Sequence, residues 1–240
     1  MCGILLIHNP ELSFNNKSLY SLRKRGPDQI GFWTQDNIHI GHTRLSIIGD
    51  DDRSRQPLEN KRYVIAHNGM IYNFEEIKKE LLNDFHNLKN ANDSEVLLWA
   101  WTKWGESCLK RLEGFWAITI YDKQKKQITL VRDQVGIKPL YYYQNKNHFI
   151  ASSLIKTILE NSNCQKELDF KALSEYVKYQ FTMGNKTFFK DIKKVEPGEI
   201  IKYDLNSLKV DKYKYEEIFS NSNKVEINSE IFNQTQNLIR

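Results

Sequence analysis

The feature that most constrains the fold is a succession of short strand-like segments that do not alternate regularly with helices. Runs rich in apolar, β-branched and aromatic residues predict strands at 2–8, 31–34, 38–43, 63–67, 115–121, 127–132, 140–144, 148–151 and 199–203. The first run is almost continuously apolar, so we expect it to be buried on both faces. Many short strands with few helices between them indicate an α+β architecture, in which helices pack outside antiparallel sheets.

Three amphipathic helices are predicted among these strands. Asn73 is placed to cap the first, with Glu76 three residues later in the position of a capping box. The second spans 93–104, has apolar residues at helical spacing, and takes Asp93 as its expected N-cap. Asp169 is expected to cap the third helix. The strands at 140–144 and 148–151 are expected to form a hairpin around Asn145-Lys146-Asn147.

The first strand carries a cysteine at the second position, followed by a glycine, in Met1-Cys2-Gly3. Small residues after an initiator methionine permit its removal. The freed α-amine then has a pKa of about 7.7 to 8.0 and the thiol one of about 8.5, so the amine can take the thiol proton near neutral pH without a separate histidine. On its own, a cysteine in a buried strand is more often a packing residue, and a chemical role depends on the motifs that follow.

Composition and charge exclude several classes of protein. No apolar stretch reaches the roughly 18 to 20 residues that span a bilayer, and the apolar start lacks a basic leader, so we expect no membrane and no secretory signal. The net charge of +5 comes from scattered lysines interleaved with acids, which favours a solvated surface over nucleic-acid binding.

The cysteines and histidines suggest neither disulfides nor a metal site. Cys2, Cys108 and Cys164 form no pair motif and have no metal-ligand spacing, which fits a reducing cytoplasm better than a disulfide framework. His39 and His42 are three residues apart in a predicted strand, so they should point to opposite faces and cannot readily share a metal. We therefore predict a cytoplasmic protein without a metal.

Seven short motifs follow the cysteine in a characteristic order. They are RGPD at 25–28, GHTRLSII at 41–48, QPL at 56–58, HNGMIYN at 67–73, NDSEV at 92–96, LEGFWA at 112–117 and RDQVGIKPLY at 132–141. In this order and spacing they closely resemble the glutaminase domain of glutamine-hydrolysing asparagine synthetases, which are class II amidotransferases of the N-terminal-nucleophile superfamily. The resemblance covers residues 2–205 and implies the four-layer αββα sandwich of that superfamily.

The resemblance implies three catalytic groups, of which two, Asn68 and Gly69, also belong to the glutamine-binding site. Cys2 would be the nucleophile, while the Asn68 side chain and the Gly69 backbone N–H would form the oxyanion hole that stabilises a tetrahedral intermediate. Asn68-Gly69, flanked by apolar residues, is also a strong signal for a tight hairpin turn. Both interpretations of this pair can hold together.

The resemblance also implies which residues bind the amino-acid end of glutamine. Arg44 would bind the α-carboxylate, a task suited to a planar bidentate group, and the backbone from Leu45 to Ile48 would line that side of the pocket. Asp93 would bind the α-ammonium group. Met70 departs from the family, which commonly has a glutamate there that helps to hold the ammonium group, so we expect weaker affinity for glutamine. No functional interpretation attaches to Asn92, where the family usually has serine.

The implied reaction is hydrolysis of glutamine to glutamate and ammonia, without a cofactor. The chain contains neither the Ser-Gly-Gly-x-Asp-Ser loop of the synthetase ATP domain nor a Walker loop, so ATP and magnesium are expected only on a missing synthetase domain or a partner chain. Residues 216–240 are rich in Asn, Ser and Lys, and we interpret 206–240 as a linker and the start of that domain. The sequence leaves open the ammonia acceptor, for which aspartate is the default, and the oligomeric state, for which a homodimer is one option.

Two alternatives remain at this stage. One is a regulatory subunit that binds glutamine with little turnover of its own. The other is a different amidohydrolase with an N-terminal cysteine. This second alternative would not need Arg44 and Asp93, which together suit the zwitterionic end of an amino acid.

Overall fold

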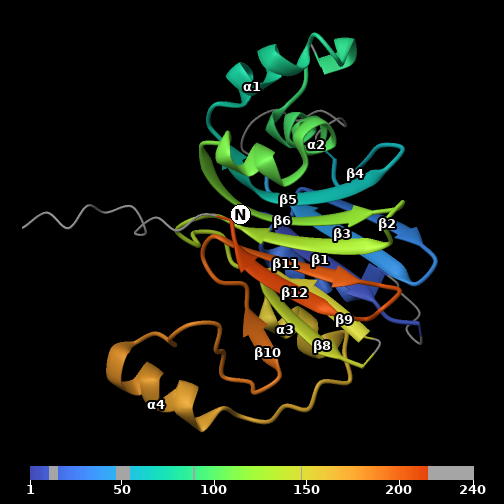
Figure 1. Cartoon of the computed structure of the whole chain (residues 1–240). Helices are drawn as coiled ribbons and strands as arrows, with labels where there is room; N and C mark the ends of the chain where they lie inside the picture. The colour runs from blue at the N-terminus through green and yellow to red at the C-terminus, as the bar shows by residue number, and fades with distance from the viewer. Residues whose placement is uncertain (11–15, 47–54, 89, 147, 216–240) are drawn as a thin grey trace, which may run out of the picture.

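The computed structural model describes residues 1–10, 16–46, 55–88, 90–146 and 148–215. Within these ranges the strands form two six-stranded antiparallel sheets packed face to face (Figure 1). The first sheet has the order β10 (Ile192–Lys194), β8 (Tyr141–Asn145), β9 (His148–Ser152), β1 (Gly3–His8), β3 (Ile38–Arg44) and β2 (Gln29–Gln35). The second has the order β12 (Val210–Lys214), β11 (Glu199–Asp204), β7 (Gln127–Arg132), β6 (Gly114–Asp122), β5 (Tyr63–Ile71) and β4 (Leu58–Glu59).

Helices cover the outer face of each sheet. The second sheet is covered by α1 (Phe74–Leu81) and α2 (Asp93–Trp104), with the short 3-10 helices η3 (His86–Leu88) and η4 (Gly105–Lys110) beside them. The first sheet is covered by α3 (Ile155–Glu160) and the 3-10 helix η1 (Asn16–Lys24), whereas α4 (Phe170–Tyr179) stands apart from the sandwich (Figure 1). The layers run α, β, β, α, which confirms the predicted four-layer sandwich.

Strand β1 lies in the middle of the first sheet and is buried on both faces, as its continuous apolar sequence predicts. Ile4 and Leu6 pack between the two sheets, while Leu5 and Ile7 pack against η1 and α3. Each fully buried side chain of this size contributes about 1.5 to 3 kcal/mol to stability. The strand therefore holds the residue that precedes it, Cys2, at a rigid position at the edge of the core.

The Asn68-Gly69 pair does not form a hairpin turn, so that interpretation is wrong. Both residues lie inside β5, where Asn68 is opposite Ala117 and Gly69 is opposite Trp116 on β6. A Cβ atom at Gly69 would lie 2.2 Å from the carbonyl oxygen of Phe115, so only glycine permits this approach of the two strands. The local turn signal is overridden because β6 pairs with the whole length of β5.

Asn73 precedes α1 but does not cap it with its side chain, so the predicted capping box with Glu76 is wrong. Its Nδ2 atom donates to the carbonyl oxygen of Arg111 at 2.9 Å, and its Oδ1 atom accepts from the backbone N–H of Glu113 at 2.9 Å. The side chain thus joins the end of β5 to the loop before β6.

The N-cap of α2 is Asn92 and not Asp93, which corrects the predicted role of the aspartate. The Asn92 side chain accepts from the backbone N–H of Glu95, and the Glu95 carboxylate accepts from the backbone N–H of Asn92, both at 3.0 Å. This is a complete capping box. Asp93 becomes the first helical residue, and its carboxylate is available to the pocket described below.

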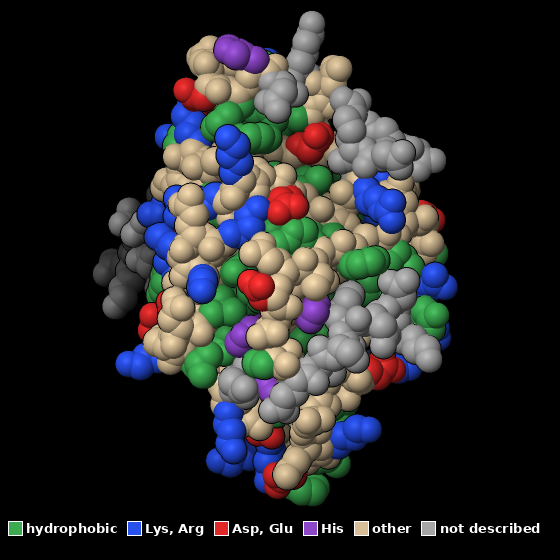
Figure 2. Space-filling view, turned by 90° about the vertical axis from the view of Figure 1, so that its right-hand side faces the viewer, with side chains coloured by type: hydrophobic (Ala, Val, Ile, Leu, Met, Phe, Trp, Pro, Cys, Tyr) green, Lys and Arg blue, Asp and Glu red, His purple; other side chains and the backbone are tan. Residues whose placement is uncertain are grey.

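The other predicted strands are present with small differences at their ends, and Asp169 caps α4 by accepting from the backbone N–H of Ala172. The strand β12 pairs with β11, so residues 210–214 of the predicted linker belong to the second sheet. On the face shown in Figure 2, basic side chains are distributed from top to bottom with acidic ones among them. No helix in the described part of the chain is long and apolar enough to cross a membrane.

Candidate active site

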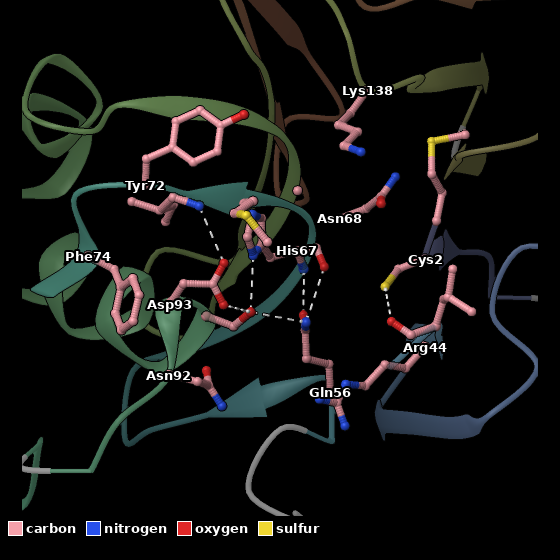
Figure 3. A pocket seen from close by; sticks show the side chains of 16 residues that line it. Cys2, Arg44, Gln56, His67, Asn68, Tyr72, Phe74, Asn92, Asp93 and Lys138 are labelled. Carbon is pink, nitrogen blue, oxygen red and sulfur yellow. Dashed lines mark hydrogen bonds between the residues drawn. The ribbon is translucent and has the colours of Figure 1, made fainter. Parts of the chain in front are cut away.

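A pocket of about 260 Å³ collects residues from both sheets and from α2 (Figure 3). Its walls come from the residues before β1, the end of β3, the second half of β5, the first turn of α2 and the loop after β7. The pocket contains seven of the residues that the sequence pointed to, namely Cys2, Arg44, Leu45, Asn68, Gly69, Met70 and Asp93. The eighth, Ile48, lies outside the described residues.

Cys2 is partly buried at the mouth of this pocket, and its main chain is held in place. Its carbonyl oxygen accepts from the Arg25 Nε atom at 2.9 Å, and its Sγ atom lies 3.9 Å from the carbonyl oxygen of Leu45. The strand is also fixed two residues later, because the backbone N–H of Ile4 donates to the Ser153 Oγ atom at 3.0 Å. The thiol is therefore presented to the pocket from a rigid strand end.

The Asn68 side chain is buried, and its Nδ2 atom has no hydrogen-bond partner. Figure 3 shows this amide pointing across the pocket toward Cys2. A buried donor without a partner costs about 1 to 3 kcal/mol, so folded proteins rarely keep one. A ligand oxygen placed above the Cys2 sulfur would satisfy it.

Arg44 and Asp93 lie on different walls of the pocket (Figure 3). The Nη1 atom of Arg44, whose side chain is buried, donates to the Gln29 Oε1 atom at 3.0 Å. The Asp93 carboxylate accepts from the backbone N–H of Ile71 at 3.3 Å and from the Ser94 hydroxyl at 3.4 Å. A guanidinium and a carboxylate on separate walls match the carboxylate and ammonium groups of an amino acid.

A buried polar network supports Asp93 from behind, and its members had no predicted role. The Gln56 amide nitrogen donates to the carbonyl oxygen of His67 at 3.1 Å and to the Ser94 hydroxyl at 3.2 Å, and its oxygen accepts from the His67 backbone N–H at 2.6 Å. The His67 Nδ1 atom lies 3.0 Å from the same hydroxyl. The network thus fixes the serine that donates to the aspartate.

Two buried histidines stay neutral in this region. Burial lowers the pKa of His42 to about 3, and its Nε2 atom lies 3.1 Å from the carbonyl oxygen of His67. Burial also lowers the pKa of His67. Among the described residues no group of three or more His, Cys, Asp or Glu side chains could hold a metal ion.

The sequence motifs contained Arg25, Gln56, His67 and Lys138 but gave none of them a role. The pocket that brings them together is built from segments distant in the sequence, so only the fold reveals their common place. The signal that could have pointed to them was their position inside the ordered motifs, next to residues with expected roles.

Comparison with known proteins agrees with this geometry. Residues 1–215 match the family model described as the glutamine amidotransferase domain. Asparagine synthetase [glutamine-hydrolyzing] 3 of Bacillus subtilis is 32% identical over 202 residues, which cover 80% of this chain and 32% of the relative. Putative asparagine synthetase [glutamine-hydrolyzing] 2 of Methanocaldococcus jannaschii is 31% identical over 225 residues, which cover 85% of this chain and 43% of the relative. The chain thus spans less than half the length of these relatives.

A solved structure with the same fold is the glutamine phosphoribosylpyrophosphate amidotransferase from B. subtilis, complexed with ADP and GMP. It superposes with a TM-score of 0.63 over 90% of this chain and 49% of that chain, at 18% sequence identity. At this identity the likeness concerns the fold alone. The family match and the relatives above 30% identity show that the chain belongs to the class II glutamine amidotransferase domains, of the type found in asparagine synthetases.

Proposed function

We propose that this domain hydrolyses glutamine to glutamate and ammonia, with Cys2 as the nucleophile once Met1 has been removed. The observation that carries the proposal is the buried Asn68 amide, which has an unpartnered nitrogen and points toward Cys2 inside one pocket with Arg44 and Asp93. A donor of this kind is suited to an oxygen that becomes negatively charged during attack by the thiol.

The reaction follows from these groups. The freed α-amine of Cys2 takes the thiol proton, and the sulfur attacks the side-chain amide carbon of glutamine. The amide oxygen takes up the displaced electron pair beside the Asn68 Nδ2 atom and the Gly69 backbone N–H. The carbon–nitrogen bond then breaks, and ammonia leaves with the proton that the amine returns. Water, deprotonated by the same amine, hydrolyses the γ-glutamyl thioester to glutamate and restores the thiol.

Substrate orientation comes from the two ends of the pocket. Arg44 binds the α-carboxylate, beside the Leu45 backbone and, as predicted from the sequence, Ile48. Asp93 binds the α-ammonium group, and the Ser94 hydroxyl and the Ile71 backbone N–H hold its carboxylate in place. This division explains how a mostly apolar pocket can select an amino acid by its zwitterionic end.

The ammonia would serve ATP-dependent amide synthesis elsewhere. The relatives that share this domain are named asparagine synthetases and are more than twice as long as the matched region, so we propose a synthetase domain or partner chain as the consumer of ammonia. ATP and magnesium would bind there, and aspartate is the default acceptor. The end of the glutaminase domain is better placed after β12 than at residue 205, because that strand completes the second sheet. A reducing cytoplasm would keep the Cys2 thiol active.

The proposal is tested by incubating the processed protein with glutamine in the absence of ATP and added metal. Turnover is expected under these conditions, because both steps of hydrolysis use only groups in this pocket. Glutamate and ammonia should appear in equal amounts, since each glutamine yields one of each. Enzymatic quantification of both products checks the ratio. Binding of glutamine without release of either product would instead favour a regulatory subunit.

Replacing Met70 with glutamate is expected to lower the KM for glutamine several-fold. Met70 lines the pocket together with Asp93, and a second carboxylate there would strengthen the hold on the ammonium group. Steady-state kinetics of the Met70→Glu variant measure this change, with Met70→Gln as the uncharged control of the same length. An unchanged KM for Met70→Glu would count against a role of this position in affinity.

A further inference from the structure

Lys138 is a third charged side chain in the Cys2 pocket, besides Arg44 and Asp93, and its backbone is firmly held. Its backbone N–H donates to the Asp133 Oδ2 atom at 3.0 Å, and its carbonyl oxygen accepts from the Arg132 Nε atom at 2.8 Å. The ammonium nitrogen lies 4.5 Å from the centroid of the Phe115 ring. The two backbone hydrogen bonds fix where the side chain begins, and the Phe115 contact places its ammonium group.

The strand register places this ammonium on the same face of the second sheet as the Asn68 amide. Phe115 is directly opposite Met70, and Ala117 is directly opposite Asn68. Side chains two residues apart on a strand share a face, and so do directly opposed cross-strand partners. An ammonium group over Phe115 therefore lies on the face from which Asn68 projects. Figure 3 shows the Lys138 side chain pointing toward the Asn68 amide, with Cys2 on the far side of that amide.

The ammonium of Lys138 has no counter-ion among the described residues. It makes no hydrogen bond or ion pair there, and its contact with Phe115 is to the aromatic face. Asp133, the acidic residue that influences its pKa, already accepts from the backbone N–H groups of Val135 and Ile137 as well as from that of Lys138. A partly buried cation without an anion is costly, and a negative charge formed in the pocket would offset that cost.

The charged and titratable groups around Lys138 come from several elements. They are Cys2 before β1, Arg25 after η1, and Asp133 in its own loop, while His67 on β5 is influenced by it in turn. Burial lowers the pKa of Lys138 below its ordinary value, which the effect of Cys2 opposes and that of Arg25 reinforces. The ammonium form therefore persists at neutral pH but is lost at lower alkaline pH than in a solvated lysine.

We propose that the Lys138 ammonium acts with the Asn68 amide in the oxyanion site and stabilises the negative charge that develops on the glutamine amide oxygen when Cys2 attacks. This inference rests on the glutaminase function proposed above. As the sulfur–carbon bond forms, the carbonyl electron pair moves to oxygen beside Lys138. When the carbon–nitrogen bond breaks, that pair returns to re-form the carbonyl. Lys138 keeps its proton throughout and contributes only charge.

The first test compares Lys138→Met, which keeps the length of the side chain, with Lys138→Arg, which keeps its charge. For the processed Lys138→Met protein, kcat is expected to fall about 10-fold to 100-fold with KM within about twofold, because the charge acts on the transition state. Lys138→Arg should recover most of kcat. Lys156→Met is the control, since that side chain is 74% exposed and lies on α3. A rise in KM with unchanged kcat would assign Lys138 to substrate binding and overturn the proposal.

The dependence of kcat on pH gives a second test, because a purely structural role of Lys138 would not change it. Activity needs the protonated ammonium, so wild-type kcat should decline at alkaline pH as Lys138 loses its proton, below the ordinary lysine range. Lys138→Met should lack this decline, and Lys138→Arg should shift it to higher pH. A decline identical in all three proteins would contradict the assignment.

A third readout does not require turnover. Glutamate γ-semialdehyde can add to the Cys2 thiol and form a tetrahedral hemithioacetal that imitates the intermediate. The Kd of the aldehyde is expected to rise about 10-fold in Lys138→Met. The Kd for glutamine should be the same in Cys2→Ala and in the double variant Cys2→Ala/Lys138→Met, neither of which turns glutamine over. If wild type releases no glutamate, the glutaminase function fails. If wild type is active and Lys138→Met is unchanged in kcat and aldehyde affinity, only the present inference fails.

Discussion

Cys2→Ala is expected to reduce glutamate release by the processed protein to background, a loss on the order of a millionfold for removal of a nucleophile. The substitution removes the attacking sulfur and leaves Asn68, Arg44 and Asp93 in the pocket, so glutamine should still bind. Release is measured by a coupled glutamate assay, and binding by calorimetry on the same preparation. Mass spectrometry gives the fraction of wild-type molecules that have lost Met1. Glutamate release should rise in proportion to that fraction, because the reaction uses the freed α-amine.

Cys164→Ala provides the matched control for this experiment. Cys164 is also a free cysteine, but burial raises the pKa of its thiol, so it remains protonated and is a poor nucleophile. Its replacement should leave kcat unchanged. Glutamate release by Cys2→Ala at a rate near that of wild type would rule out the N-terminal thiol as the nucleophile.

Much of the fold was predictable because the spacing of apolar residues indicates which faces of an element are buried. The strand β1 is continuously apolar because it lies between the other sheet on one face and helices on the other, and the central strands β5 and β6 of the second sheet are buried on both faces for the same reason. The β12 strand could not be predicted, since Val210–Lys214 is mostly polar and exposed and owes its structure to pairing with β11. Such an edge strand depends on its neighbour and carries little signal of its own.

The wrong local predictions have two physical causes, namely competition between adjacent residues of equal propensity and strand pairing that overrides a local turn. Asn92 and Asp93 are both good N-caps, and the choice is made by Glu95, whose carboxylate reaches back to the Asn92 backbone. Asn68-Gly69 is a good turn in isolation, but the pairing of β5 with β6 requires an extended strand. In both cases the outcome is decided by a residue or strand that the adjacent pair does not contain.

The candidate site was predictable only in part. The ordered motifs identified Cys2, Arg44 and Asp93, and the fold brings them into one pocket. Lys138 and Gln56 could not be assigned, because the pocket that they line is built from segments distant in the sequence. Lysine and glutamine are common surface residues, so their types alone gave no reason to select them.

Asn68→Ala is expected to lower kcat for glutamine hydrolysis about 100-fold to 1000-fold with little change in KM, because the lost donor acts on the developing oxyanion. Removal of most buried hydrogen-bonding side chains lowers stability, but Asn68→Ala should not. The Asn68 Nδ2 atom has no partner in the free protein, so its removal breaks no hydrogen bond and relieves a buried unsatisfied donor. The melting temperature of Asn68→Ala should therefore equal or exceed that of wild type.

Asn161→Ala is the matched comparison, since that asparagine is also buried but its Nδ2 atom donates to the carbonyl oxygens of Ser18 and Thr157 at 3.2 and 2.9 Å. Its replacement should lower the melting temperature by several degrees and leave kcat unchanged, because it leaves buried acceptors without a donor far from the pocket. Kinetics and thermal melting of both variants thus separate a donor kept for catalysis from one kept for folding. If Asn68→Ala instead destabilised the protein and retained kcat, Asn68 would be a structural residue, and the oxyanion site would have to be built from Gly69 and Lys138 alone.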